Sequence, residues 1–182
     1  MIDYIGDISI NDAEVLKELA KNAVNILEFG AGASTQVLAY YTKGDLITVE
    51  TNPGWIEKTA ANIARLGIPA HGVYYKTYKQ FQEYPEGPYD LIFDDGVDSL
   101  RLDFAQSSWK LLKVGGTFCF HDTRRSSDVK NVCMLLELFS PEIHTIIMNK
   151  DHSNITTILK KKAEFYENWN EVEEKELWQY GK

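Results

Sequence analysis

Short apolar runs alternate with helix-forming segments along most of the chain, and this alternation limits the fold more than any other feature. Runs typical of buried strands cover residues 24–30, 45–50, 71–76, 89–95 and 115–122, and helical spacing of apolar residues fills the intervals between them. Strands that alternate with helices form a parallel sheet with helices on both faces. The sequence therefore predicts an α/β fold.

The last part of the chain departs from this alternation. Two β-rich runs, 142–149 and 153–161, are separated by only three residues, which is too short for a crossover helix. They should therefore pair as an antiparallel hairpin. A chain of 182 residues can bury one core, so we expect one domain with a helical segment at 1–22, a core at 23–161 and a helix at 162–182.

Composition disfavours two classes of partner. The chain has 19 basic and 27 acidic residues, which gives a formal net charge of -8 and a pI near 5.0. Such a chain repels polyphosphate, so nucleic acid is a disfavoured partner. No apolar run approaches the roughly 18 residues that cross a bilayer, so no membrane partner is expected. Asp3 and Asp7 stand where a signal peptide would carry basic residues, and we expect a cytoplasmic location.

The first predicted strand runs into a loop with two glycines, Gly30 and Gly32, followed by Ser34 and Thr35 at the start of a helix. In a doubly wound sheet such a loop lies at the carboxyl ends of the strands, where ligands bind. A dinucleotide-binding loop would need a third glycine at position 35, and the carboxylate of Glu28 would repel a pyrophosphate. The loop therefore favours a ligand that carries positive charge.

Glu50 ends the second predicted strand, 22 residues after Glu28. This is close to the usual spacing between a glycine-rich loop and the acid that binds a ribose diol. Glu50 thus predicts a ribose with both hydroxyls free. S-adenosylmethionine (SAM) is a ligand that combines a ribose and a positive charge with no phosphate.

Four stretches carry a resemblance to a known family: LEFGAGAST at 27–35, TVETNPGW at 48–55, YDLIFDDG at 89–96 and LLKVGGTFCFHD at 111–122. From about residue 8 to 161 the chain resembles the class I SAM-dependent methyltransferases, in particular their small O-methyltransferase-like branch. The resemblance implies a Rossmann-like, mostly parallel sheet of seven strands that ends in the antiparallel hairpin, with helices on both faces. It assigns the SAM contacts to Glu28, Phe29, Gly30, Gly32, Ser34, Thr35, Glu50, Thr51 and Asp94.

The candidate catalytic residues follow the fourth and fifth strands, which the resemblance makes neighbours. If so, Asp95 and Asp122 could share Mg²⁺, which would lower the pKa of a bound hydroxyl. Thr123 and Asp98 depart from the pattern of metal-dependent members, so a metal-free site with His121 as general base is the alternative. Neighbours on a strand face opposite sides, so His121 and Asp122 converge only if the strand ends before them.

We expect a SAM-dependent methyltransferase that methylates a hydroxyl of a small molecule. Two alternatives stay open: an enzyme of the same fold with aminopropyl-transfer or sugar-processing chemistry, and a nucleotide-binding module without catalysis. The adenine contact is also open, with Tyr75, Thr77 and Tyr78 as candidates. Residues 1–10 and the aromatic stripe of the predicted helix at 162–182 are candidates for the acceptor pocket, and that helix also leaves open a homodimer.

Overall fold

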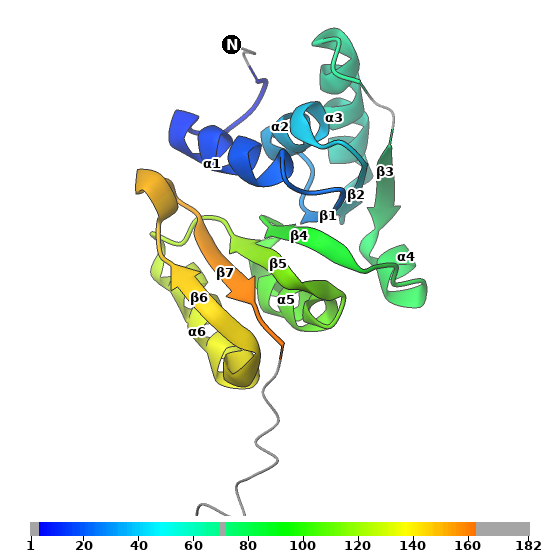
Figure 1. Ribbon diagram of the computed structural model, residues 1–182. Helices are drawn as coiled ribbons and strands as arrows, with labels where there is room; N and C mark the ends of the chain where they lie inside the picture. The colour runs from blue at the N-terminus through cyan, green and yellow to red at the C-terminus, as the bar shows by residue number, and fades with distance from the viewer. Residues whose placement is uncertain (1–3, 70–71, 163–182) are drawn as a thin grey trace, which may run out of the picture.

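The predicted strands join into one sheet with helices on both faces (Figure 1). The computed structural model describes residues 4–69 and 72–162. The strands are β1 (Asn25–Phe29), β2 (Asp45–Glu50), β3 (Val73–Thr77), β4 (Tyr89–Asp94), β5 (Leu112–Phe120), β6 (Ile143–Ile147) and β7 (Thr156–Lys160). They lie in the order β3-β2-β1-β4-β5-β7-β6.

The hairpin predicted near the end of the chain is present. Strands β1 to β5 pair in parallel, whereas β7 lies antiparallel to both of its neighbours, β5 and β6. The predicted fold class, a mostly parallel seven-stranded α/β sheet with an antiparallel terminal hairpin, is therefore confirmed. The helix predicted at 162–182 lies outside the described residues, apart from Lys162.

Six α-helices within the described ranges flank the sheet. They are α1 (Ile10–Ala20), α2 (Ala33–Tyr41), α3 (Pro53–Arg65), α4 (Tyr78–Glu83), α5 (Arg101–Trp109) and α6 (Ser126–Phe139). Helices α1 to α3 cover one face of the sheet, above a core layer that includes Leu16 and Leu38 (Figure 1). Helices α4 to α6 cover the other face, where Phe104 and Leu135 are buried. None of the helices in 4–69 and 72–162 is long and apolar enough to span a membrane.

Local sequence signals explain where the helices start and stop. The Ser9 hydroxyl caps α1 by accepting the N–H of Asp12 (3.1 Å). Asn52 caps α3, and Pro53 occupies its first turn, where a missing N–H costs nothing. After α3 the chain turns at Gly67, whose φ of +63° favours glycine.

Candidate functional site

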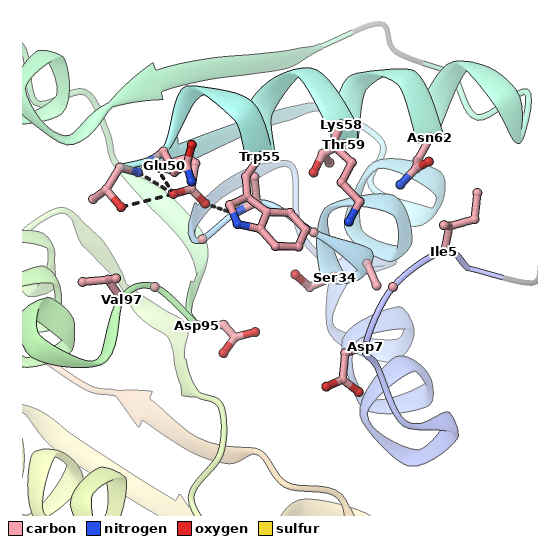
Figure 2. Close-up of a pocket in the computed structure, with 18 residues that line it drawn as sticks. Ile5, Asp7, Ser34, Glu50, Trp55, Lys58, Thr59, Asn62, Asp95 and Val97 are labelled. Atoms are coloured by element: carbon pink, nitrogen blue, oxygen red, sulfur yellow. Dashed lines mark hydrogen bonds between the residues drawn. The ribbon is translucent and has the colours of Figure 1, made fainter.

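A cavity of about 530 Å³ opens at the carboxyl ends of β1, β2 and β4 (Figure 2). The order of the sheet reverses here, because the chain runs outward from β1 to β3 and then restarts at β4, beside β1. Ligands bind at this point in doubly wound sheets. The predicted site residues that line the cavity are Gly30, Gly32, Ser34, Glu50, Thr51 and Asp95.

The two loop glycines have different structural roles. Gly30 has a φ of +91°, and a Cβ there would lie 2.4 Å from the carbonyl oxygen of Asp95. Glycine at this position therefore lets the loop after β1 pack against the loop after β4. Around Gly32, apart from its own atoms and those of its two chain neighbours, no atom of the described residues lies within 4 Å of the place where a Cβ would be. Because Gly32 also borders the cavity, its missing side chain leaves room for a ligand.

Glu28 lies inside the protein beneath the loop, fully buried, and does not line the cavity. Its carboxylate accepts hydrogen bonds from the hydroxyls of Ser34 (2.6 Å) and Thr48 (2.8 Å). Burial raises the pKa of Glu28 to about 7, and hydrogen bonds from Ser34, Thr35 and Thr48 oppose part of that rise. The Thr35 hydroxyl also accepts the N–H of Gly32 (2.9 Å). Glu28 and Thr35 together stabilise the conformation of the glycine loop. Thr35 occupies the position at which a dinucleotide-binding loop would have its third glycine.

Glu28→Gln should make stability less dependent on pH near neutrality. The folded-state pKa is raised from 4.5 to about 7, so the stability that this group contributes is present below pH 4.5 and is lost as the pH rises through about 7. Glutamine does not ionise, so relative to the wild type the variant should gain on the order of 2 to 3 kcal/mol between pH 4.5 and pH 8. Urea unfolding at both pH values measures this gain, with the exposed Glu57→Gln as control. Equal pH profiles for Glu28→Gln and the wild type would contradict the raised pKa.

Glu50 reaches the cavity from the end of β2 (Figure 2). Its Oε1 accepts the N–H groups of Thr51 (2.6 Å) and Asn52 (2.8 Å), and its Oε2 accepts the N–H of Ala31 (2.9 Å). Glu50 therefore joins the glycine loop to the start of α3. Among the described residues Oε2 carries this one hydrogen bond, and a carboxylate oxygen has two lone pairs, so it can accept a ligand hydroxyl as well.

Helix α3 supplies a wall of the cavity that sequence reasoning missed. Trp55 and Lys58 both line it, and the Lys58 ammonium lies 4.3 Å from the centre of the Trp55 ring. Figure 2 shows the Lys58 side chain pointing from α3 into the cavity. The sequence places both residues on an amphipathic helix, where such side chains are common on any exposed face, so no local signal distinguished them.

The segment before α1 forms another wall, and its predicted role in the acceptor pocket stays a prediction. Ile5 and Asp7 line the cavity (Figure 2). Gln36 of α2 is buried and holds this segment by two hydrogen bonds, because its amide oxygen accepts the N–H of Ile5 (2.8 Å) and its amide nitrogen donates to the Ile5 carbonyl (2.8 Å). The segment is therefore fastened to the helix that begins at the glycine loop.

Behind Asp95 lies a cluster made by the loops after β4 and β5. The strands end at Asp94 and Phe120, so Asp95, His121 and Asp122 all follow a strand rather than lie within one. Asp122 has a φ of +58°, and the chain turns immediately after β5. One ligand-type atom of each of the three residues lies within 4.8 Å of the other two. Neighbouring residues point to opposite faces only within a strand. His121 and Asp122 both follow the end of β5, so their side chains can lie close together.

His121 is held between carboxylates. Its Nδ1 lies 3.0 Å from Asp95 and 3.5 Å from Asp122, and its Nε2 lies 3.4 Å from Asp12 of α1. Burial acts to lower the pKa of His121, but hydrogen bonds to Asp12 and Asp95 and the charges of Asp95 and Asp122 raise it to about 10. The raised pKa favours the protonated ring at neutral pH, and a protonated ring has no free lone pair. This speaks against the predicted general base and favours a fixed positive charge.

Arg101 of α5 lies between the two carboxylates that the sequence predicts to share Mg²⁺. Its Nη2 is 2.9 Å from Asp95 and 3.2 Å from Asp122. A divalent cation bridging these carboxylates would lie against the guanidinium, and like charges repel. The residues present therefore do not fit the predicted Mg²⁺ site. Sequence reasoning did not identify Arg101.

Besides Glu28 and Thr35, two further residues that the resemblance assigned to SAM have their side chains in the interior. Phe29 is buried and stacks on Phe104, with ring centroids 4.5 Å apart. Asp94 is also buried, and burial raises the pKa of its carboxyl well above the usual range. Neither side chain lines the cavity, so the Phe29 and Asp94 contacts stay predictions. The candidate adenine contacts do not line it either: Tyr75, Thr77 and Tyr78.

No protein-family model matches this chain, and no curated protein sequence matches it. Solved structures do match. An O-methyltransferase from Bacillus cereus in complex with SAH is 22% identical, with 86% of this chain and 84% of that chain covered and a TM-score of 0.69. An O-methyltransferase from Streptomyces achromogenes, involved in tomaymycin synthesis and in complex with SAM, is 21% identical, with 86% and 82% covered and a TM-score of 0.70. A SAM-dependent O-methyltransferase from Thermotoga maritima is 16% identical, with 88% and 68% covered and a TM-score of 0.70.

The chain has the fold of SAM-dependent O-methyltransferases. The methyltransferase fold expected from the four sequence stretches is thereby confirmed. At identities of 16% to 22% the likeness concerns the fold, whereas the activity depends on the residues around the cavity.

Proposed function

We propose that this chain is a SAM-dependent methyltransferase that transfers a methyl group to a hydroxyl of a small molecule. The observation that carries the proposal is the cavity at the switch point of a methyltransferase fold, with Glu50 at its edge and open space beside Gly32. Its volume of about 530 Å³ lies within the range of small-ligand sites. Two structures with the same fold are complexes with SAH or SAM.

The charges around the cavity suit SAM better than a dinucleotide. Among the described lining residues the carboxylates are Asp7, Glu50 and Asp95, and the cation is Lys58. The sulfonium and amino groups of SAM are attracted to such a lining, whereas a pyrophosphate is repelled. We expect Glu50 to bind the ribose hydroxyls and Lys58 to pair with the carboxylate of SAM. Decarboxylated SAM, the donor in aminopropyl transfer, lacks that carboxylate, so Lys58 favours methyl transfer over this alternative.

Asp95 is the predicted catalytic residue that lines the cavity. An acceptor hydroxyl beside it would attack the methyl carbon, and the C–S bond would break with its electron pair passing to sulfur. Asp95 would accept the hydroxyl proton. The cations next to Asp95, His121 and Arg101, would stabilise the negative charge that develops on the acceptor oxygen. Asp122 would act as a positioning residue, because it accepts hydrogen bonds from Arg101 (3.2 Å) and Asn154 (3.0 Å).

Calorimetric titration of the full chain with SAM, SAH and NAD tests the proposal. SAM and SAH should bind with micromolar dissociation constants, and NAD should not bind. Binding of NAD alone, or of none of the three, would contradict the proposed function. The proposed reaction assigns no step to Mg²⁺, because the position of Arg101 speaks against the predicted metal site.

Glu50→Gln should weaken SAM binding by about 10- to 100-fold, which corresponds to about 1 to 3 kcal/mol. The amide keeps the shape of the side chain, but it removes the charge and one acceptor that the Ala31 N–H and a ribose hydroxyl would share. The titration is repeated on Glu50→Gln and on the exposed control Glu57→Gln, which should bind SAM as the wild type does. Unchanged SAM affinity in Glu50→Gln would show that Glu50 does not contact the ribose.

A further inference from the structure

We propose that Arg101 takes the place of the divalent cation predicted at this site, so that Asp95 and Asp122 are bridged by a fixed guanidinium and no metal binds between them. The proposal concerns the charge cluster behind the cavity and goes beyond methyl transfer. Only its consequence for the acceptor hydroxyl rests on the proposed function.

The guanidinium of Arg101 contacts carboxylates from three separate parts of the chain. Nη2 donates to Asp95 (2.9 Å), after β4, and to Asp122 (3.2 Å), after β5. Nη1 donates to Asp128 (3.0 Å), in the first turn of α6. A single arginine therefore joins the loops of two strands and the start of a helix, as a bridging metal ion would.

The remaining donors of Arg101 are bound to the backbone. Nε donates to the carbonyl of Gly96 (2.9 Å), and Nη1 donates to the carbonyl of His121 (3.2 Å). A guanidinium has five N–H groups, and each of them has an acceptor here. The side chain is only 3% exposed. The position of the guanidinium is therefore determined by the fold.

In each of the two aspartates that would coordinate a metal, one carboxylate oxygen already has two cationic partners. Asp95 Oδ1 faces both Arg101 Nη2 and His121 Nδ1, and Asp122 Oδ2 faces both Arg101 and Arg125. Mg²⁺ needs near-octahedral oxygen ligands at close range, and it would have to displace these charged donors. Moving Arg101 away would also leave Asp128, which is 2% exposed, without its most buried cationic partner.

This arrangement has a consequence for the acceptor, if the proposed function is right. Arginine stays charged at every physiological pH, so the positive charge beside Asp95 does not depend on metal supply. Methyl transfer should then proceed at the same rate in EDTA as in Mg²⁺.

Binding of Mn²⁺, followed by electron paramagnetic resonance of the free ion, tests the proposal on the full chain. Arg101→Ser removes the guanidinium between Asp95 and Asp122 and so exposes both carboxylates to ions in solution. This variant should bind Mn²⁺ at least tenfold more tightly than the wild type, which should leave Mn²⁺ free at the same concentrations. Arg124→Ser is the matched control, because Arg124 is exposed and donates to the carbonyl of His152 instead (2.7 Å). It should behave as the wild type does.

The wild type alone decides the matter if Arg101→Ser does not fold. Mn²⁺ binding by the wild type that disappears in Asp122→Asn would overturn the proposal. Absence of binding, or binding that persists in Asp122→Asn and therefore lies elsewhere on this acidic chain, supports it. SAM titration is independent of these results, so a failure of the proposed function and a failure of this inference are distinguishable.

Discussion

Gly30→Ala is expected to cost on the order of 3 kcal/mol of folding free energy, because it combines backbone strain with an overpacked contact. The φ of +91° at Gly30 is unfavourable for any residue with a Cβ, and that Cβ would lie 2.4 Å from the Asp95 carbonyl oxygen. Backbone atoms cannot move aside as a flexible side chain can. Urea unfolding measures the loss. A variant as stable as the wild type would show that the two loops do not pack as described.

Gly32→Ala is the matched control for Gly30→Ala, with the opposite pattern of effects. Its Cβ meets no described atom within 4 Å, so stability should change by less than about 1 kcal/mol. The new methyl group would project into the space beside the cavity, so SAM affinity should fall in the titration. Loss of stability without loss of affinity would contradict the role assigned to Gly32.

The wild type should lose stability relative to His121→Gln as the pH rises from 6.5 to 10, by up to about 1.4 kcal/mol per pH unit. The folded-state pKa of His121 is raised from 6.5 to about 10. Its contribution is therefore fully present below pH 6.5 and is lost as the pH rises through about 10. The groups that face the ring are Asp12 from α1, Asp95 after β4 and Asp122 beside it in sequence. All three raise the pKa of His121 and so favour the imidazolium.

Urea unfolding of the wild type and His121→Gln at pH 6, 8 and 10 gives the difference directly. His144→Gln serves as the control, because His144 is exposed on β6.

Asp12 adds a check at the acid end of the pH range. Burial acts to raise the pKa of Asp12, but hydrogen bonds to His121, Ser9 and Asn154 lower it to about 2, so its contribution is present above pH 3.8 and is lost as the pH falls through about 2. A pH-independent difference between wild type and His121→Gln would mean that the pKa of His121 is the same in the folded and unfolded states.

Features that depend on local pattern could be predicted from the sequence. The alternation of strands with helices and the terminal hairpin each rest on a few adjacent residues, and the structure contains both. The glycine loop and Glu50 were also found in this way, because strand ends at a switch point concentrate ligand contacts. Whether a predicted residue faces the cavity or the core was harder, since Phe29 and Gly30 are adjacent and only Gly30 lines the cavity.

Arg101 could not be predicted, because its role depends on contacts between distant segments. In the sequence it is an arginine near the start of an ordinary amphipathic helix. Its carboxylate partners follow β4, follow β5 and begin α6, and no spacing rule relates them. The protonation of His121 likewise depends on Asp12, which lies in the first helix of the chain. The charge state of this cluster therefore follows from tertiary structure alone.

The contacts of the Asp12 carboxylate also bear on the order in which the protein folds during its synthesis. Its Oδ1 accepts the backbone N–H of Asn154 (2.6 Å), just before β7, while its Oδ2 lies 3.4 Å from His121. Contacts at such long sequence separation form only after most of the chain has been made, and they are slow to close. While the chain is still on the ribosome, the contact between α1 and the segment before β7 must therefore wait for Asn154, and Asp12 can pair with His121 only once the loop after β5 has been made.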